Sequence, residues 1–262
     1  MTSMPHDIAV ALIAARYLAG PGDPAWITVP LHHACGWSSA KDPLVPQVIL
    51  TSPDQRAQLR IDPDPDEPWW AIRHTRSGDQ PPWSVTFDAR TPVEIIAALT
   101  DALTDPSGPP PTPGHPYGPL RAAGWHAPRY HDGLTSPDGM SSPNGLARVD
   151  RVTHNGGTTS WIVETSGPQL PAIWRAYLDG NTPVHLVAAL FRALADETPL
   201  IRDPHRVPAL ASAQGTTITR RVPVEAVAFA LENRVANLAA RHTAMTTRAP
   251  AALPLPKQRR RR

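Results

Sequence analysis

The stretch from Trp70 to Val93 reads WAIRHTRSGDQPPWSVTFDARTPV and decides the fold. Apolar and polar residues alternate on both sides of the turn at 78–82. A period of two is typical of β-strands with one buried face, and the short connection implies that the two strands are antiparallel. We therefore expect the residues of the apolar parity in a core. They are Trp70, Ile72, Trp83, Val85 and Phe87.

A helix is expected directly after these strands. Thr91 can serve as the N-cap, Pro92 suits the first helical position, and Glu94 stands where a capping box needs a carboxylate. Upstream, an apolar run at 48–50 and an alternating run at 57–61 predict two further strands. The unit therefore reads ββββα.

The same pattern occurs a second time along the chain. Five pairs of identical residues share a spacing of 91, namely Trp70 and Trp161, Trp83 and Trp174, Asp88 and Asp179, Thr91 and Thr182, and Pro92 and Pro183. A constant spacing over such a length predicts two copies of one unit, which are too few for a solenoid. We expect a pseudo-symmetric pair of domains whose second core contains Trp161, Val163, Trp174 and Leu178.

Shorter matches extend the repeat upstream at other spacings. Ser52-Pro-Asp54 matches Ser136-Pro-Asp138 at a spacing of 84, and Gly36-Trp37 matches Gly124-Trp125 at 88. Arg60 and Asp62 match Arg148 and Asp150, also at 88. The changes of spacing fall in turn-rich segments, where insertions are tolerated.

These patterns predict an α+β protein of tandem ββββα repeats with antiparallel sheets, a C-terminal helix and a disordered basic tail. The helix is expected from Pro223 to about Thr246, and the segment 200–223 before it looks irregular. The expected division is an N-terminal segment 1–23, a first repeat 24–106, a Pro-rich linker 107–116, a second repeat 117–199, an irregular segment with the helix 200–247, and a tail 248–262.

Composition and charge exclude several classes of protein. A single cysteine excludes a disulfide scaffold and a cysteine-rich zinc site, and no apolar run is long enough to span a membrane. With no recognisable signal peptide, we expect a cytoplasmic protein. The net charge is +2, but five of the last six residues are basic. Without those six, 20 basic residues face 23 acidic ones, a net charge of −3.

The paired motifs resemble the SPDY-type domain of unknown function (number 317 in its series), a family of Streptomyces and related actinobacteria. The resemblance rests on Leu50-Thr-Ser-Pro-Asp54, Thr135-Ser-Pro-Asp138 and Ala89-Arg-Thr-Pro-Val-Glu-Ile-Ile-Ala97, and it covers about residues 16–200 in two tandem copies. The position after the motif holds Gln55 and Gly139 in place of the family's tyrosine. The family name implies no activity. Genes for such proteins often lie near mobile-element and plasmid genes, and the resemblance therefore points weakly to DNA transactions.

A second resemblance is architectural. Tandem ββββα units are the topology of Whirly-type single-stranded-DNA binders, in which two antiparallel sheets pack about a pseudo-dyad and expose surfaces to nucleic acid. No Whirly sequence motif is present, so this is an analogy of fold, and fold alone does not establish function.

The candidate nucleic-acid contacts lie on the polar parity of the strands and in the tail. Trp69 and Tyr177 fall on that parity and could stack on bases, whereas the remaining strand tryptophans are expected in the core. Cationic residues could contact phosphates. The basic candidates are Arg60, Arg73, Arg76, Arg148, Arg175, Lys257, Arg259, Arg260, Arg261 and Arg262. The alternative is a solvated sheet face and a tail that reflects compositional bias.

Little in the sequence indicates catalysis. Cys35 lies beside His32 and His33, and a thiol with an imidazole can form a nucleophile, but a small buried cysteine is the expected reading. The acidic run at 62–67 is interrupted by prolines and is expected to be a solvated turn. We expect no catalytic residue, no metal site and no cofactor.

The sequence thus favours a non-enzymatic accessory protein that associates with nucleic acid and has no membrane attachment. Single-stranded DNA is the candidate ligand. The alternative is a protein-interaction scaffold that makes no contact with nucleic acid. Binding of oligonucleotides and the charge of the sheet faces would distinguish the two.

Overall fold

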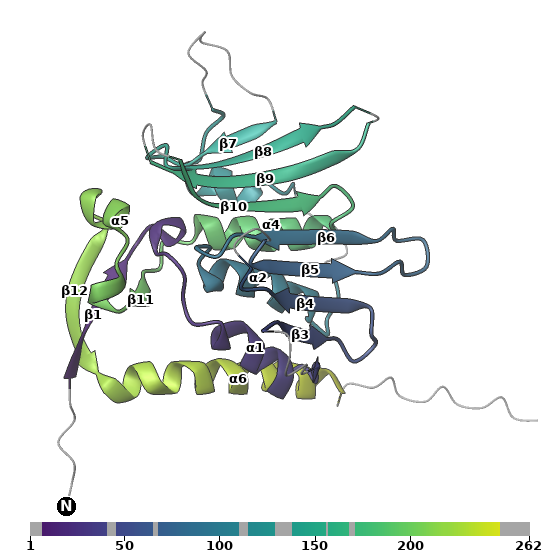
Figure 1. Cartoon of the computed structure of the whole chain (residues 1–262), viewed down its shortest axis with the longest axis horizontal. Helices are drawn as coiled ribbons and strands as arrows, with labels where there is room; N and C mark the ends of the chain where they lie inside the picture. Colours follow the sequence, from purple (N-terminus) through teal and green to yellow (C-terminus); the bar gives the residue numbers. More distant parts are fainter. Residues whose placement is uncertain are drawn as a thin grey trace, which may run out of the picture.

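In the computed structural model, the described residues are 7–40, 46–64, 68–109, 115–128, 138–155, 157–167 and 171–246. The chain is an α+β protein with antiparallel sheets, interspersed helices and a long C-terminal helix (Figure 1). The tail 248–262, the Ser136-Pro137 pair and residues 110–114 of the proline-rich linker lie outside the described residues.

Each repeat contributes strands followed by a helix, as the alternation and the Thr-Pro motifs predict, but the described part of the first repeat has five strands in place of the predicted four. In the first repeat these are β2 (Ser38–Ala40), β3 (Val48–Thr51), β4 (Ala57–Ile61), β5 (Trp70–His74), β6 (Trp83–Phe87) and α2 (Val93–Leu103). In the second they are β7 (Gly139–Ser141), β8 (Ala147–Thr153), β9 (Thr159–Ser166), β10 (Ala172–Asp179) and α4 (Val184–Ala195). Short helices precede the strands of each repeat, α1 (Ala25–His33) and α3 (Gly118–Ala122).

The two repeats share one sheet. Its order is β2-β3-β4-β5-β6-β10-β9-β8-β7, and β6 pairs with β10 in antiparallel fashion. Thr86 lies opposite Tyr177, and these two residues occupy equivalent positions in the repeats, so a pseudo-two-fold axis passes between them. The Whirly analogy predicts two sheets that pack about a pseudo-dyad, and its two separate sheets are wrong here, because the strands of the two repeats join edge to edge in one sheet.

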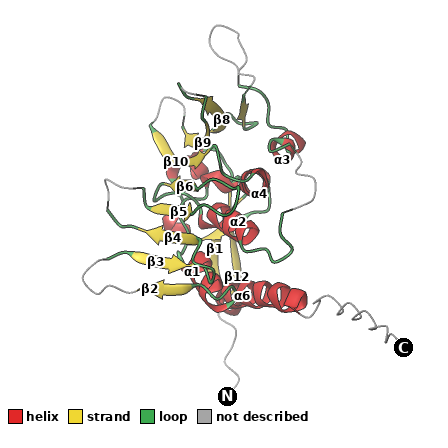
Figure 2. Cartoon of the chain, turned by 90° about the vertical axis from the view of Figure 1, so that its right-hand side faces the viewer, coloured by secondary structure: helices red, strands yellow, loops and turns green. Residues whose placement is uncertain are grey.

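The core lies between this sheet and the helices on one of its faces. Helices α2 and α4 lie side by side, and in Figure 2 the helices stand on one side of the strands. All nine residues of the predicted apolar parity are buried, including Trp70 and Trp174. Aromatic residues of this size bury about 150–250 Å² each, so they dominate the core.

The repeat continues upstream, but with a different alignment of the loops. Gly36 and Gly124 both have positive φ and stand next to buried tryptophans, which confirms the Gly-Trp match. An added Cβ at these glycines would meet Pro53 and Pro143 respectively. The partner of Ser52-Pro-Asp54 is therefore Ser142-Pro-Asn144, at a spacing of 90, and the predicted match at 136–138 is wrong.

Hydrogen bonds establish the same equivalence. The Ser52 hydroxyl donates to Asp54 Oδ1 at 2.6 Å and accepts from the Ala57 N–H at 2.9 Å. In the second loop Ser142 donates to Asn144 Oδ1 at 2.8 Å and accepts from the Ala147 N–H at 2.9 Å. It follows that Arg148 corresponds to Gln58 rather than to Arg60.

The helix starts differ from the expected capping box. Helix α2 begins at Val93 with Pro92 as its N-cap, and the Thr91 hydroxyl is buried without a hydrogen-bond partner among the described residues. Glu94 accepts from Arg202 instead, at 2.8 and 2.7 Å. A bidentate guanidinium partner competes successfully with a backbone N–H for this carboxylate.

The two ends of the chain form a second sheet that the sequence did not indicate. Its order is β11 (Leu200–Arg202), β1 (Asp7–Ile13), β12 (Thr217–Pro223), all antiparallel. The segment 200–223, expected to be irregular, also contains η2 (Pro204–Arg206) and α5 (Ala209–Ala213), and η1 (Arg16–Leu18) follows β1. The last helix, α6 (Val224–Thr246), matches its prediction closely and packs on α1.

Candidate interaction face

The face of the nine-stranded sheet that α2 and α4 leave uncovered is the candidate functional site; we call it the open face. It carries the polar parity of the strands, and five of the predicted residues lie on it, namely Arg60, Arg73, Arg148, Arg175 and Tyr177. Across the centre of this face Ala71, Thr86, Tyr177 and Ile162 lie opposite one another in neighbouring strands. Tyr177 is 41% exposed, as predicted.

Trp69 does not match its prediction. It is only partly exposed and packs against the core. It stands just before β5, where its carbonyl accepts from the Asp62 N–H at 2.9 Å, so the backbone pairing extends to it and its limited exposure comes from packing against the core. Tyr177 is therefore the aromatic residue available on the open face among the predicted pair.

In the second repeat, both predicted arginines of the open face are paired with carboxylates. Arg175 Nε lies 2.7 Å from Glu164 Oε2, and Arg148 Nε lies 2.6 Å from Asp150 Oδ2. The Glu164 carboxylate raises the pKa of Arg175 by hydrogen bonding and by its charge. These pairs make the second-repeat half of the open face close to neutral.

The first-repeat half is more basic. Arg60 lies 3.3 Å from Asp62, a buried carboxylate that also accepts from Gln47. Arg73 and Arg76 are exposed, and neither forms an ion pair within the part of the chain that the structure describes. Arg73 has the uncharged Gln58 and Ser84 as cross-strand neighbours.

A polar row distinguishes the two repeats. In the second repeat His126, Ser141, Arg148, Glu164 and Arg175 lie directly opposite one another across successive strands. The equivalent row of the first repeat contains a single charge, at Arg73. It consists of Ser38, Thr51, Gln58, Arg73 and Ser84.

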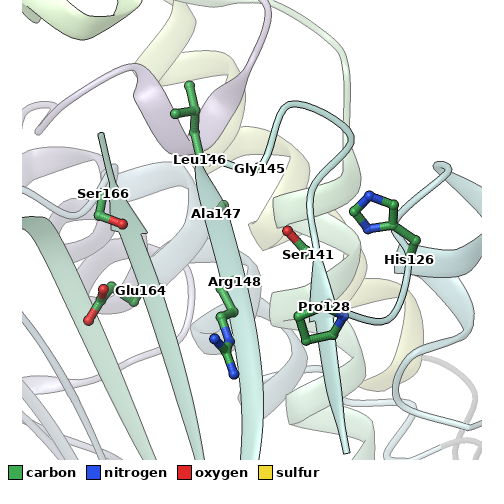
Figure 3. Close-up of a pocket in the computed structure, with 9 residues that line it drawn as sticks. All are labelled: His126, Pro128, Ser141, Gly145, Leu146, Ala147, Arg148, Glu164 and Ser166. Carbon is green, nitrogen blue, oxygen red and sulfur yellow. The ribbon is translucent and has the colours of Figure 1, made fainter. Parts of the chain in front are cut away.

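A cavity of about 460 Å³ opens at the outer end of the second row (Figure 3). Its polar lining includes His126, Ser141, Arg148 and Glu164. In Figure 3 the His126 ring and the Ser141 hydroxyl stand on adjacent segments, whose backbones exchange two hydrogen bonds, of 3.0 and 2.7 Å. Among the described residues, no hydrogen bond joins the ring itself to the hydroxyl. The cavity thus offers donors and acceptors without an activated nucleophile.

The other catalytic candidate, Cys35, is half-buried. Burial raises the pKa of its thiol and the Asp101 charge adds to this rise, whereas a hydrogen bond with Thr104 and the guanidinium groups of Arg234 and Arg241 have smaller, opposite effects. The nearby His32 uses Nδ1 to contact the Trp37 carbonyl at 2.7 Å. A protonated thiol whose neighbouring imidazole is engaged elsewhere is a poor nucleophile.

The His, Cys, Asp and Glu side chains of the described residues do not gather in threes at any point in a way that could hold a metal ion. None of the described helices combines the length and the apolar character needed to cross a membrane. The tail candidates from Lys257 to Arg262 lie outside these residues.

Comparison with known proteins identifies the repeats. A family model described as "SPDY: Domain of unknown function (DUF317)" matches residues 51–109 and 141–200. The two matches begin at Thr51 and Ser141, which are equivalent in the structure. Neither a curated protein nor a solved structure matches the chain. Residues 51–109 and 141–200 therefore belong to the SPDY family of domains, two copies of which build the shared sheet of this protein.

Proposed function

We propose that the chain is a non-enzymatic interaction protein that docks a protein partner on its open face. The observation that carries this proposal is a sheet with helices on one face and paired charges on the other. The repeats build this broad surface by joining their edges, and a broad sheet face is better suited to a macromolecule than to a small substrate.

The charge pattern favours a protein over a nucleic acid. Phosphate backbones are bound by cations that have no competing carboxylate, because affinity comes from the release of counterions. Arg60, Arg148 and Arg175 already have carboxylate partners. A mixed surface with an exposed tyrosine at its centre resembles the composition of protein interfaces, in which tyrosine and arginine are enriched.

Site-specific photocrosslinking in cells tests this proposal. A photoreactive amino acid placed at Tyr177 or at Arg73 should capture the same protein, whereas one at Arg192, which is exposed on α4, should not. Tyr177→Ala should then weaken binding of the purified partner by about tenfold, as expected for a central aromatic contact. Equal capture from all three positions would contradict a role for the open face.

Single-stranded nucleic acid is the second candidate, and Arg73 and Arg76 favour it. Both are exposed near one end of β5 without an ion pair among the described residues. With Tyr177 they supply the cation and the aromatic ring that single-strand binders combine. The basic residues of the tail would add phosphate contacts.

Fluorescence anisotropy with single-stranded oligonucleotides at two salt concentrations tests this candidate. Replacing Arg73 and Arg76 by alanine should reduce the salt slope by about 1.4, at roughly 0.7 for each phosphate contact. Arg206→Ala, which removes an exposed arginine on η2, is the matched control. A truncation after residue 250 separates the tail from the sheet, and an unchanged slope in the double variant would exclude the open face.

A further inference from the structure

The second sheet ends in an edge strand, β12, whose outer side pairs with no other strand of the described residues. All seven residues of β12 pair with β1 on the inner side, from Thr217 opposite Ile13 to Pro223 opposite Asp7. In Figure 1, β12 is the outermost strand at the left of the molecule. Free backbone N–H and C=O groups on such an edge are a template for another strand.

The side chains of β12 combine apolar and basic character. Ile218 is 67% exposed and shares a face with Arg220 and Val222. On the same face Leu12 lies between Ile218 and Ile201 in the neighbouring strands, and Ile201 is exposed as well. The row Ile201, Leu12 and Ile218 therefore forms an apolar strip that ends at the free edge.

Two arginines set the charge of this edge. Arg220 and Arg221 point to opposite faces of the strand, and both are exposed. Arg221 donates to the Asp7 carbonyl at 3.1 Å, while Arg220 forms no ion pair with any of the described residues. A strand added to β12 would meet positive charge on both of its faces.

The same arginines argue against a second copy of this chain. Self-pairing that uses the whole strand is centred on Arg220 and places the two Arg220 side chains opposite each other. Like charges directly opposite each other destabilise a sheet, whereas opposite charges stabilise it. The edge therefore disfavours itself and is complementary to carboxylates.

We propose that β12 accepts an extended segment of a partner protein as a fourth antiparallel strand, in which apolar residues face Ile218 and Val222 and acidic residues face Arg220 and Arg221. This mode of recognition takes affinity from the backbone and specificity from alternating side chains. The surface is distinct from the open face and does not depend on the function proposed for it.

Two synthetic peptides test the proposal on the full chain. The acidic peptide, Thr-Val-Glu-Glu-Thr-Val-Thr with blocked ends, places its glutamates opposite the two arginines in the antiparallel register. The control peptide has lysine at both glutamate positions. The acidic peptide should bind about tenfold more tightly, because two attractive pairs replace two repulsive ones. Amide-exchange protection should appear at 217–223.

A charge reversal supplies the second arm. The double variant Arg220→Glu, Arg221→Glu should invert the preference between the peptides, and circular dichroism should show an unchanged fold because both side chains are exposed. Equal binding of the two peptides, or protection outside β12, would overturn the proposal. So would protection of β12 by phosphatidylserine vesicles alone, or by self-association of the chain in sedimentation.

Discussion

Gln55 and Gly145 occupy the same position of the two Ser-Pro loops, and both have positive φ, of 59° and 72°. This left-handed conformation costs a residue with a Cβ about 1–2 kcal/mol, while glycine loses more backbone entropy on folding. Space is not the constraint, because a Cβ at Gly145 would meet nothing within 4 Å. We therefore expect Gln55→Gly to stabilise the fold by about 0.5–1 kcal/mol and Gly145→Gln to destabilise it similarly.

Urea unfolding of the two variants checks this prediction. Because the loops share their hydrogen bonds, each variant serves as the control for the other. Shifts of the same sign in both would show that the loops are not equivalent.

Asp54 gives the first loop a pH dependence that the second lacks. The Ser52 hydroxyl and the Arg56 N–H donate to Asp54 Oδ1, and these hydrogen bonds lower its pKa against a smaller opposing effect of burial. A carboxyl with a depressed pKa stabilises the folded state above its unfolded pKa, near 4, and this stability is lost as the pH falls through the folded pKa. Asp54→Asn copies Asn144 and removes this dependence.

We expect wild type to be more stable than Asp54→Asn at neutral pH and the difference to shrink on acidification below about pH 4. Urea midpoints measured across that range check this. A difference that stays constant with pH would mean that the hydrogen bonds do not depend on the charge of Asp54.

At the scale of elements, ion pairs hold the terminal elements on the first repeat. Arg202 in β11 binds Glu94 of α2 at 2.7 Å and also donates to the Gly20 carbonyl. Arg234 of α6 binds Asp101 of α2 at 2.7 Å, donates to the Trp26 carbonyl, and lies over the Trp26 ring. Helix α2 is therefore joined by ion pairs to both β11 and α6.

Removing the Arg202 side chain from its buried ion pair should lower the stability of the fold. The Arg202 and Glu94 side chains are 8% and 16% exposed, so Arg202→Ala leaves a nearly buried carboxylate unpaired. We expect a loss of about 3 kcal/mol in the free energy of unfolding. The control is Arg16→Ala, because its partner Asp196 is 38% exposed and a pair of this kind contributes about 1 kcal/mol or less. Equal losses in thermal or urea unfolding would contradict the role of burial.

The elements also show what the sequence could predict. The strands at 48–51, 57–61, 70–74 and 83–87 and the helices after them follow from local periodicity, and α6 follows from its apolar stripe. Strand β12 carries two arginines and an exposed face, and among the described residues it pairs with β1, which lies about 200 residues earlier in the chain. Local patterns contain no information about such a partner.

The open face was predicted in part for the same reason. Parity placed Tyr177 outside and the strand tryptophans inside, since every second residue shares a face. The ion pairs of Arg60 with Asp62 and of Arg148 with Asp150 could also have been predicted from the sequence, because residues two apart in a strand lie on one face. The ion pair of Arg175 with Glu164 could not be predicted without the register of β9 and β10. The two loops were misaligned because the sequence comparison matched two identical Ser-Pro-Asp motifs, whereas the equivalent loop in the structure reads Ser142-Pro-Asn144.

At the scale of the whole molecule, the junction of β6 and β10 makes the repeats dependent on each other. Val85 and Leu178, both fully buried, lie opposite each other across the junction, and α2 packs on α4 beside it. A separated second repeat, residues 115–200, would expose the edge of β10 and the inner face of α4. Since the junction is pseudo-two-fold symmetric, we expect this fragment to form a homodimer through β10.

Light scattering after size exclusion would show twice the fragment mass. Leu178→Lys in the fragment is the control and should prevent dimerisation by burying a charge at the junction. A folded, monomeric fragment would show that each repeat is an independent domain.

Strand β1 lies between β11 and β12 in the sheet. Both neighbours are therefore synthesised roughly 200 residues after it. During translation at roughly 5–20 residues per second, the N-terminal strand waits on the order of 10–40 s before both neighbours have been synthesised. Such non-local pairing also slows folding. Strand β1 therefore stays uncovered long after its own synthesis, and we expect its apolar residues to be accessible to chaperones during that time.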